Sequence, residues 1–294
     1  MAVNGYRSAD RAKAFLIVEG SQDCNVYRLF ACPTRCAVQW GYGRANALDA
    51  GRLLDRDGFV GFVVAMDQDH WIIDNSHPKD SFVVWTDGRD LESTLLFAGV
   101  ADRIIANFAH PGSLDEIKRE TGKTVMDHLV DWCSTLGAMR WVIVRGRMFL
   151  SCKEIDAFGS VDRESLEISV ERLAYAIIDA SDHPLRGSRQ SLAKRLVFET
   201  KQLLAKAGQQ RWLYCSGHDL CRALASGLRE DFGRDLCEGL TAEVIEASVR
   251  SAYAWSDFER TDLHHRIRAW EGGNAPWRVL ADRPNPVSLN QEAQ

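Results

Sequence analysis

The sequence lacks any long apolar run, since no stretch of about eighteen residues is free of polar and charged side chains. This absence argues against a membrane-spanning helix. Residues 1–8 also lack the apolar segment of a secretory signal, so we expect a cytoplasmic protein that does not associate with membranes. Neither internal repeats nor low-complexity tracts stand out, and 294 residues suffice for one large domain or one core with an appendage.

Several motifs of common enzyme classes are missing too. The Gly-x4-Gly-Lys-Ser/Thr spacing of a P-loop is absent throughout, as is the dinucleotide-binding fingerprint of the Rossmann fold. No Gly-x-Ser-x-Gly elbow is present to place a nucleophilic serine. We therefore do not expect the chain to hydrolyse ATP by itself.

Net charge and cysteine content indicate what the sequence predicts about nucleic-acid binding and disulfides. The net charge of −5 gives no global signal for nucleic-acid binding, so such binding would need a local basic patch. Eight cysteines are scattered through a chain too long to need disulfides for stability. Without an export signal, we expect all of them to be free thiols.

What the sequence does contain is a set of short apolar runs. Residues 12–18, 37–40, 59–66 and 82–86 are rich in Val, Ile, Phe and Trp, as buried strands are. Helical periodicity separates them, most clearly over 46–56. This alternation predicts an α/β fold with a mostly parallel sheet flanked by helices.

Beyond residue 100 the pattern becomes helical. Residues 211–215 are predicted to be a late strand that returns to the sheet and brings His218 and Asp219 to its carboxyl edge. We thus expect a core over 1–105, completed by 209–230 if the chain returns, a helical insertion over 106–208 and a C-terminal helical segment over 231–294. The individual helices are expected from Ser113 and over 125–137, 162–178, 190–207 and 241–270, while 141–144 fits a strand or a helix end.

Carboxylates follow two of the predicted strands directly. Glu19 ends the first, and Asp67 and Asp69 end the third, where two residues of an extended chain would point the same way. The carboxyl ends of parallel strands share one edge of a sheet, so these three side chains should converge and need a cation. Mg²⁺ is the simplest, with Mn²⁺ as an alternative. The competing interpretation is that Glu19 caps the next helix and the aspartates are ordinary loop residues.

Three more acidic residues follow the fourth strand. Helix N-termini favour negative charge, and we prefer that role for Asp87. Asp90 and Glu92 are kept as outer members of the metal site. Before them, the sequence Gly41-Tyr42-Gly43-Arg44 either lets the backbone approach a ligand with Arg44 at the mouth, or forms only a tight turn.

Basic residues gather in the second half of the chain, where they could follow a phosphate backbone or form a solvated helix face. Cys215-x2-His218-x2-Cys221 could bind zinc, but only Cys237 offers itself as a fourth ligand, so we do not favour it. The first basic cluster, which contains only one acid, Glu199, comprises Arg186, Arg189, Lys194, Arg195, Lys201 and Lys206; the second comprises Arg260, His264, His265, Arg266 and Arg268.

The order Val18-Glu19-Gly20, Gly41-x-Gly43-Arg44 and Met66-Asp67-x-Asp69 resembles a TOPRIM domain, the fold of topoisomerases, primases and overcoming-lysogenization-defect (OLD) nucleases. Asp90-Leu-Glu92 and Ser216-Gly-His218-Asp219 look more particularly like the AriB family of effectors of the PARIS anti-phage system. These motifs cover about a third of the chain, mostly 13–97 and 211–228. Many relatives have a lysine after the second-strand glycine, where this chain has Tyr42.

The resemblance implies a TOPRIM-like core with a large helical insertion or appendage. It further implies a Mg²⁺-dependent nuclease that an ABC-type ATPase sensor holds. After release, the nuclease would cleave host tRNA rather than DNA, and a homodimer is one possible form of the active state. The implied metal ligands are Glu19, which could also act as general base, Asp67 and Asp69, with Asp90 or Glu92 completing the shell, while Arg44 would face a phosphate. Apart from the resemblance, we expect substrate contacts from His218 at the sheet edge and from Lys194 and Arg195 in the first basic cluster. The alternatives are an OLD-like DNA endonuclease and a non-catalytic regulatory or docking subunit of an ATPase complex.

Overall fold

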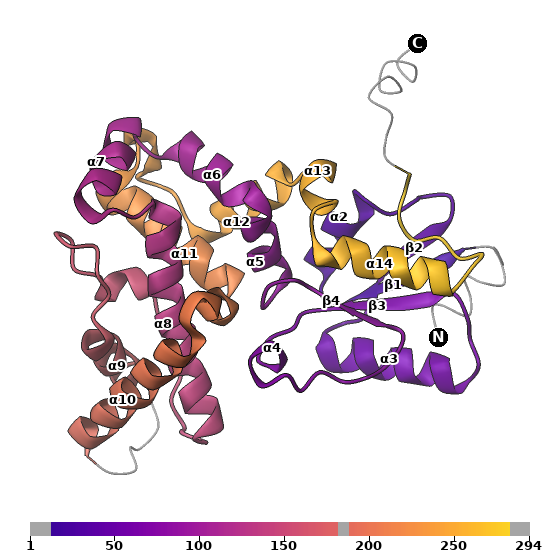
Figure 1. Cartoon of the computed structure of the whole chain (residues 1–294), viewed down its shortest axis with the longest axis horizontal. Helices are drawn as coiled ribbons and strands as arrows, with labels where there is room; N and C mark the ends of the chain where they lie inside the picture. Colours follow the sequence, from indigo (N-terminus) through magenta and orange to yellow (C-terminus); the bar gives the residue numbers. More distant parts are fainter. Residues whose placement is uncertain (1–12, 182–187, 283–294) are drawn as a thin grey trace. The chain divides into compact units, whose positions relative to one another are not determined.

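The computed structural model describes residues 13–181 and 188–282 and divides them into two compact units (Figure 1). The sheet unit comprises 13–68, 77–87 and 254–282, and the helical unit comprises 69–76 and 88–253. The predicted divisions at 105, 208 and 231 do not coincide with these units. Residues 88–105 lie with the helical unit, and the last described segment lies with the sheet unit.

The sheet unit contains a four-stranded, entirely parallel sheet in the order β2-β1-β3-β4. The two central strands are buried along their whole length, which explains why their sequences are uninterrupted apolar runs. The strands are β1 (Ala14–Val18), β2 (Cys36–Trp40), β3 (Phe62–Met66) and β4 (Val83–Trp85). The predicted fold class, α/β with a parallel sheet flanked by helices and a large helical appendage, is confirmed.

Helices cover both faces of this sheet. Figure 1 shows α2 (Ser21–Arg28) and α14 (Asp262–Gly273) on one side and α3 (Arg44–Arg56) on the other. Gly51 lets α3 approach closely, because a Cβ atom there would lie 2.4 Å from the Phe82 ring and 2.9 Å from a Val64 methyl. The short helix α13 (Trp255–Phe258) precedes α14.

The late helix α14 is anchored to the sheet by polar contacts. The Asp87 carboxylate accepts hydrogen bonds from the backbone N–H groups of Asp262 (2.8 Å) and Leu263 (2.6 Å), the first residues of α14. Arg266 donates to the carbonyls of Trp85 (2.7 Å) and Thr86 (3.1 Å) at the end of β4. Asp87 therefore supplies negative charge to a helix N-terminus, as predicted, but to that of a helix far along the chain.

The helical unit is built around α8 (Val125–Arg145), which packs against α10, α11 and the 3-10 helix Gly208–Tyr214. Gly137 permits this contact, since a Cβ atom there would lie 1.9 Å from the Tyr214 carbonyl oxygen. The remaining helices are α4 (Trp71–Asp74), α5 (Leu91–Leu95), α6 (Ala101–Phe108), α7 (Pro111–Thr121), α9 (Val170–Asp179), α10 (Arg189–Ala207), α11 (Gly217–Gly227) and α12 (Ala242–Ala252). Within the described chain, no helix is both long and apolar enough to cross a bilayer.

Three predictions about these helices are wrong. Residues 211–215 belong to a 3-10 helix and the following turn, and Tyr214 packs with Ala138 and Trp141 instead of joining the sheet. The helix predicted over 162–178 begins only at Val170, after a bridge between Val161 and Ile168. The stretch 241–270 is divided into three separate helices. Residues 141–144, for which a strand and a helix end were both expected, are the end of α8. Short apolar runs such as 211–215 are compatible with a strand and with a buried helical turn, so their periodicity could not distinguish the two.

A buried ion pair links α8 to α11 in the helical unit. Arg140 donates two hydrogen bonds to Asp219, at 2.6 and 3.1 Å, and the Asp219 side chain is 6% exposed. This pairing accounts for Asp219, which we predicted at the carboxyl edge of the sheet. Its carboxylate is fully engaged within the helical unit.

Replacing Arg140 with Ala should lower the free energy of unfolding by about 3–5 kcal/mol, because it leaves the buried Asp219 carboxylate without its partner. Lys201→Ala is the matched control, since Lys201 and Glu171 form an exposed pair that contributes less than about 1 kcal/mol. Urea denaturation of both variants measures the difference. Equal losses in the two variants would show that the Arg140–Asp219 pair is not a buried anchor.

Candidate functional site

The strand order sets a topological switch point at one defined place in the sheet unit. The connection through α2 leads from β1 to one neighbour, β2, and the connection through α3 crosses to the other neighbour, β3. Parallel α/β sheets bind ligands beyond the carboxyl ends of strands at such a switch point. Glu19 follows β1 and Asp67 follows β3, so both lie at this position.

The Glu19 carboxylate accepts two of the hydrogen bonds at this switch point. Its Oε1 atom accepts a hydrogen bond from the Asp67 backbone N–H (2.9 Å) and another from Arg44 Nε (3.3 Å). Arg44 also donates to the Asp67 carbonyl oxygen (3.2 Å). The structure thus brings together three of the predicted site residues, Glu19, Asp67 and Arg44.

Burial shifts the protonation equilibrium of Glu19. Desolvation raises the pKa of its carboxyl group above the ordinary value, although the Arg44 charge and the Asp67 N–H act in the opposite direction. A carboxylate with a raised pKa is a better proton acceptor near neutral pH. Glu19 therefore has the properties of a general base as well as those of a cation ligand. It does not cap the following helix: Gly20 occupies that position, and Asp23 supplies the capping carboxylate to the Gly20 N–H (2.8 Å).

The loop between β2 and α3 closes over the end of β1. The Gly41 and Gly43 N–H groups donate to the carbonyls of Val18 and Glu19, both at 2.8 Å. A Cβ atom at Gly41 would lie 2.6 Å from that of Ala47, while Gly43 has φ 101°, a value that favours glycine. The glycines thus form a tight turn, the second of the two predicted roles, and this turn places Arg44 at the start of α3.

Asp69 does not continue the extended backbone after β3. Its φ of 44° lies in the left-handed region, so the prediction that Asp67 and Asp69 point the same way from an extended segment is wrong. Asp69 belongs to the helical unit, where its N–H donates to the Arg89 carbonyl (2.7 Å) and its carboxylate lies 3.9 Å from Arg89 Nε. Between the two aspartates, the Gln68 side chain donates to the carbonyls of Thr86 (2.5 Å) and Asp87 (3.0 Å).

Asp90 and Glu92 have other partners in the helical unit. Asp90 caps α5 by accepting from the Ser93 N–H (2.8 Å) and also accepts from the Gly217 N–H at the start of α11 (2.9 Å). Glu92 pairs with Arg250 at 3.0 Å, and both carboxylates are buried. These contacts join α5, α11 and α12, so a structural role accounts for both residues.

His218 lies at the first turn of α11, with its side chain mostly exposed. Its Nδ1 atom is 2.6 Å from Glu246, and this hydrogen bond raises the pKa of His218 to about 9, although burial acts against it. His218 is therefore a cation at neutral pH. Glu246 and Arg250 lie four residues apart on α12, a spacing from which their ion pair can be predicted. Their other partners, His218 and Glu92, come from distant segments of the chain.

The residues predicted to bind metal do not form a complete cluster. Within 13–181 and 188–282, no three His, Cys, Asp or Glu side chains lie close enough together to hold an ion. A zinc site at Cys215, His218 and Cys221 is absent from the same residues, and burial raises the pKa of both thiols well above its usual range. All eight cysteines are free, as predicted.

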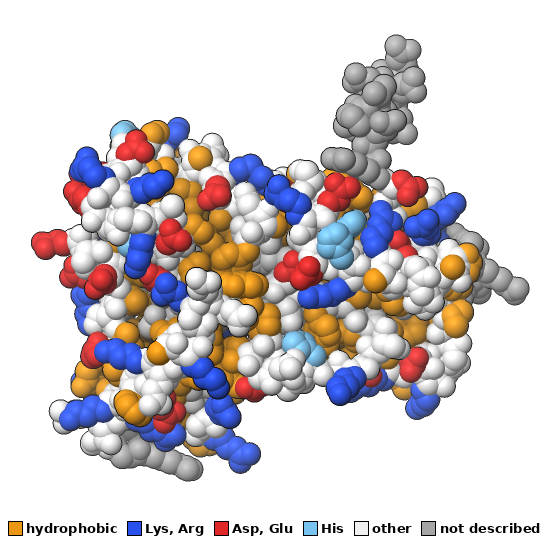
Figure 2. Space-filling view, viewed as in Figure 1, with side chains coloured by type: hydrophobic (Ala, Val, Ile, Leu, Met, Phe, Trp, Pro, Cys, Tyr) orange, Lys and Arg blue, Asp and Glu red, His pale blue; other side chains and the backbone are white. Residues whose placement is uncertain are grey.

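Ion pairs neutralise much of the first predicted basic cluster. Arg189 pairs with Asp179, Arg195 with Glu199 (2.7 Å), and Lys201 with Glu171 (2.8 Å), while Arg186 lies outside the described residues. Lys194 and Lys206 form no ion pair with another described residue. The second basic cluster is likewise bound to its neighbours, as in Arg260 with Asp257 and Arg268 with Glu271. Figure 2 shows acidic and basic side chains interspersed over the visible face.

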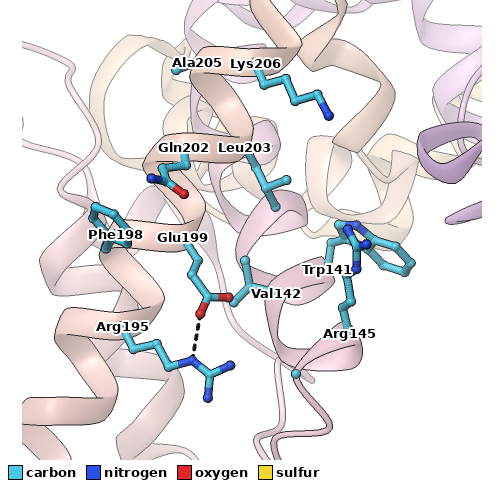
Figure 3. Close-up of a pocket in the computed structure, with 11 residues that line it drawn as sticks. Trp141, Val142, Arg145, Arg195, Phe198, Glu199, Gln202, Leu203, Ala205 and Lys206 are labelled. Atoms are coloured by element: carbon cyan, nitrogen blue, oxygen red, sulfur yellow. Dashed lines mark hydrogen bonds and ion pairs between the residues drawn. The ribbon is translucent and has the colours of Figure 1, made fainter.

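A groove between α8 and α10 in the helical unit was not predicted. Its volume is about 890 Å³, and Figure 3 shows Glu199 and Leu203 of α10 facing Trp141 and Val142 of α8. We call this feature the α8–α10 groove, lined by Trp141, Val142, Arg145, Gly146, Arg195, Phe198, Glu199, Gln202, Leu203, Ala205 and Lys206. Phe198, which is exposed at this groove, ends the apolar run Leu196-Val197-Phe198, so no sequence signal indicated that its side chain faces solvent.

No protein-family model matches this sequence, and no curated protein matches it in a sequence comparison.

The raised pKa of Glu19 predicts a pH-dependent effect of Glu19→Gln. The pKa of Glu19 is higher in the folded state than in the unfolded state. At a pH below the unfolded-state pKa, the protonated carboxyl group therefore contributes its full stabilisation of the fold. This stabilisation is lost as the pH rises through the folded-state pKa. Gln cannot ionise, so its stability relative to the wild type should improve between pH 4 and pH 7. Thermal denaturation across this range measures the effect. A difference that stays constant with pH would contradict the burial of an ionised carboxylate.

Proposed function

We propose that this chain is a metal-dependent phosphodiesterase that cleaves nucleic acid at the carboxyl edge of its parallel sheet. One observation carries the proposal: at the switch point of the sheet, the Glu19 carboxylate meets the Arg44 guanidinium, and both are hydrogen-bonded to the backbone of Asp67, Glu19 to its N–H and Arg44 to its carbonyl oxygen. Two carboxylates and a guanidinium are the groups that would bind a divalent cation and a phosphate, respectively.

The number of carboxylates at this position is compatible with Mg²⁺. Mg²⁺ commonly uses one or two protein carboxylates and completes its octahedron with water and substrate phosphate oxygens. Glu19 and Asp67 supply that number, and both recorded contacts of Glu19 fall on Oε1, which leaves Oε2 for a further partner. We therefore assign the ion, Mg²⁺ or Mn²⁺, to Glu19 and Asp67. The assignment needs no contribution from Asp69, Asp90 or Glu92, all of which belong to the helical unit.

Each residue then has a definite task. When bound, the metal ion acidifies water and offsets the charge that develops on the phosphate. Glu19 accepts a proton from the attacking water, for which its raised pKa is suitable. Arg44, fixed at the start of α3, donates to a non-bridging phosphate oxygen and orients the scissile bond.

The biological setting is proposed from the resemblance to AriB-type TOPRIM effectors alone. On that basis the substrate is host tRNA, the enzyme is held by an ABC-type ATPase sensor until a phage is detected, and cleavage stops translation. A homodimer in the active state belongs to the same proposal. An OLD-like DNA endonuclease would use the same residues on a different substrate.

Expression of wild type, Glu19→Gln and Arg44→Ala in bacteria tests the activity. We expect discrete tRNA fragments with the wild type only, with rates at least about 100-fold lower for Glu19→Gln because both proton acceptor and ligand are lost. Arg52→Ala is the control, since Arg52 lies on the same helix but pairs with Asp80 on the surface. Total RNA and DNA are examined after induction, and the purified proteins are assayed with Mg²⁺ and with EDTA.

Each outcome decides between the readings. Degraded DNA with intact RNA would redirect the assignment to a DNA nuclease. Cleavage that survives in Glu19→Gln or in EDTA would overturn the mechanism. Mg²⁺ should also raise the melting temperature of the wild type more than that of Glu19→Gln, because a ligand that binds only the folded state stabilises it.

A second candidate function is docking, which the α8–α10 groove favours. Trp141, Val142 and Leu203 provide apolar lining, and Arg145 and Lys206 add positive charges that form no ion pair with other described residues. An amphipathic acidic helix of an ATPase partner has the complementary chemistry. In this interpretation the helical unit holds the chain on its partner, whether or not the sheet unit is catalytic.

Charge reversal in the groove tests this docking. Lys206→Glu and Arg145→Glu should each weaken the complex with an ABC-type ATPase encoded beside the gene by about tenfold, because like charges then face each other across the interface. Lys194→Glu is the matched control: Lys194 also lies on α10 and forms no ion pair with another described residue, but it does not line the groove. Co-purification and titration at two salt concentrations measure the effect, and an equal loss in the control would refute docking at the groove.

A further inference from the structure

Two aromatic side chains stack on each other at the end of β2, where both are open to solvent. The Trp40 and Tyr42 rings have centroids 4.1 Å apart and planes inclined by 22°. Trp40 is 43% exposed and Tyr42 is 70% exposed. Burial in a core therefore does not explain why two large aromatic residues occupy these positions.

The backbone at Tyr42 makes the choice of residue more unusual. Its φ of 61° lies in the left-handed region, which bulky residues avoid and glycine adopts freely. The turn is nevertheless fixed, because Asn46 donates to the Tyr42 carbonyl oxygen (2.9 Å) and Gly43 donates to that of Glu19 (2.8 Å). An exposed ring on a strained backbone points to a function of the ring itself.

The position of the pair connects it to the candidate site. Trp40 is paired in register with Val18, the residue before Glu19, and Tyr42 is two residues before Arg44. All of these residues belong to the sheet unit and lie at the carboxyl ends of its strands. A nucleotide whose phosphate meets Arg44 would thus have a flat apolar surface within reach of its base.

We propose that Trp40 and Tyr42 form a platform on which one unpaired nucleobase of the substrate stacks. This inference rests on the proposed function and specifies its substrate class as single-stranded nucleic acid, or the loops and ends of a folded one. Stacking on aromatic side chains tolerates every base because each has a π-face. Bases within a duplex already stack on both sides, so the platform rejects continuous double strands.

Binding of fluorescein-labelled 12-nucleotide single-stranded RNA, followed by anisotropy in EDTA, tests the platform without cleavage. Tyr42→Gly should weaken binding by about tenfold, the effect expected from loss of one stacked base, while Tyr42→Phe retains wild-type affinity. Tyr42→Gly should also be at least as thermally stable as the wild type, since glycine adopts φ 61° without strain. Loss of affinity therefore cannot be attributed to misfolding.

The controls separate stacking from general effects. Phe149→Ala removes another exposed aromatic ring, from the helical unit, and should leave affinity unchanged. A duplex of the same sequence should bind the wild type more weakly than the single strand. The proposal is overturned if Tyr42→Gly binds as tightly as Tyr42→Phe, if the duplex binds equally well, or if the wild type binds no RNA.

The outcomes also distinguish this inference from the proposed function. Tyr42-dependent binding without cleavage in Mg²⁺ would support the platform and refute the nuclease. Cleavage with no dependence on Tyr42 in either binding or rate would support the nuclease and refute the platform.

Discussion

In the sheet unit, one partly buried glutamate side chain holds the ends of the two central strands together. Through one oxygen atom, Glu19 connects the end of β1 to the end of β3 and to the first residue of α3. These contacts partly replace the hydrogen bonds to water that the carboxylate loses on burial. The compensation is incomplete, because the pKa of Glu19 stays raised. The same oxygen thus organises the strand ends and leaves the group chemically reactive.

Ionic contacts play a different role in the helical unit, where they join helices that share little sequence proximity. Arg140 with Asp219 joins α8 to α11, while Asp90 joins the start of α5 to the start of α11. Glu92 with Arg250 adds α12 to this set. Acidic residues that look alike in the sequence therefore divide into two groups. Asp90, Glu92 and Asp219 join helices of the helical unit, whereas Glu19 and Asp67 lie at the carboxyl ends of β1 and β3.

The sheet could be predicted because its strands carry a strong local signal. Central strands buried on both faces must be uninterrupted apolar runs, and the carboxylates after β1 and β3 then follow from parallel topology. The distant partners of Asp87, Asp90 and Glu92 could not be predicted, since Leu263, Gly217 and Arg250 are more than a hundred residues away. The false strand at 211–215 has a related cause: its apolar residues are buried against α8, and local pattern does not reveal the partner.

The sheet unit is assembled from three separate segments of the chain, and the last of them supplies α14. During synthesis, the four strands and α3 emerge long before this helix does, with residues 88–253 of the helical unit in between. The face of the sheet that α14 packs against, and the Asp87 carboxylate that receives its first N–H groups, must wait for residues beyond 254. Completion of the sheet unit therefore waits for the synthesis of residues 254–282, and the nascent chain carries an uncovered apolar surface until then.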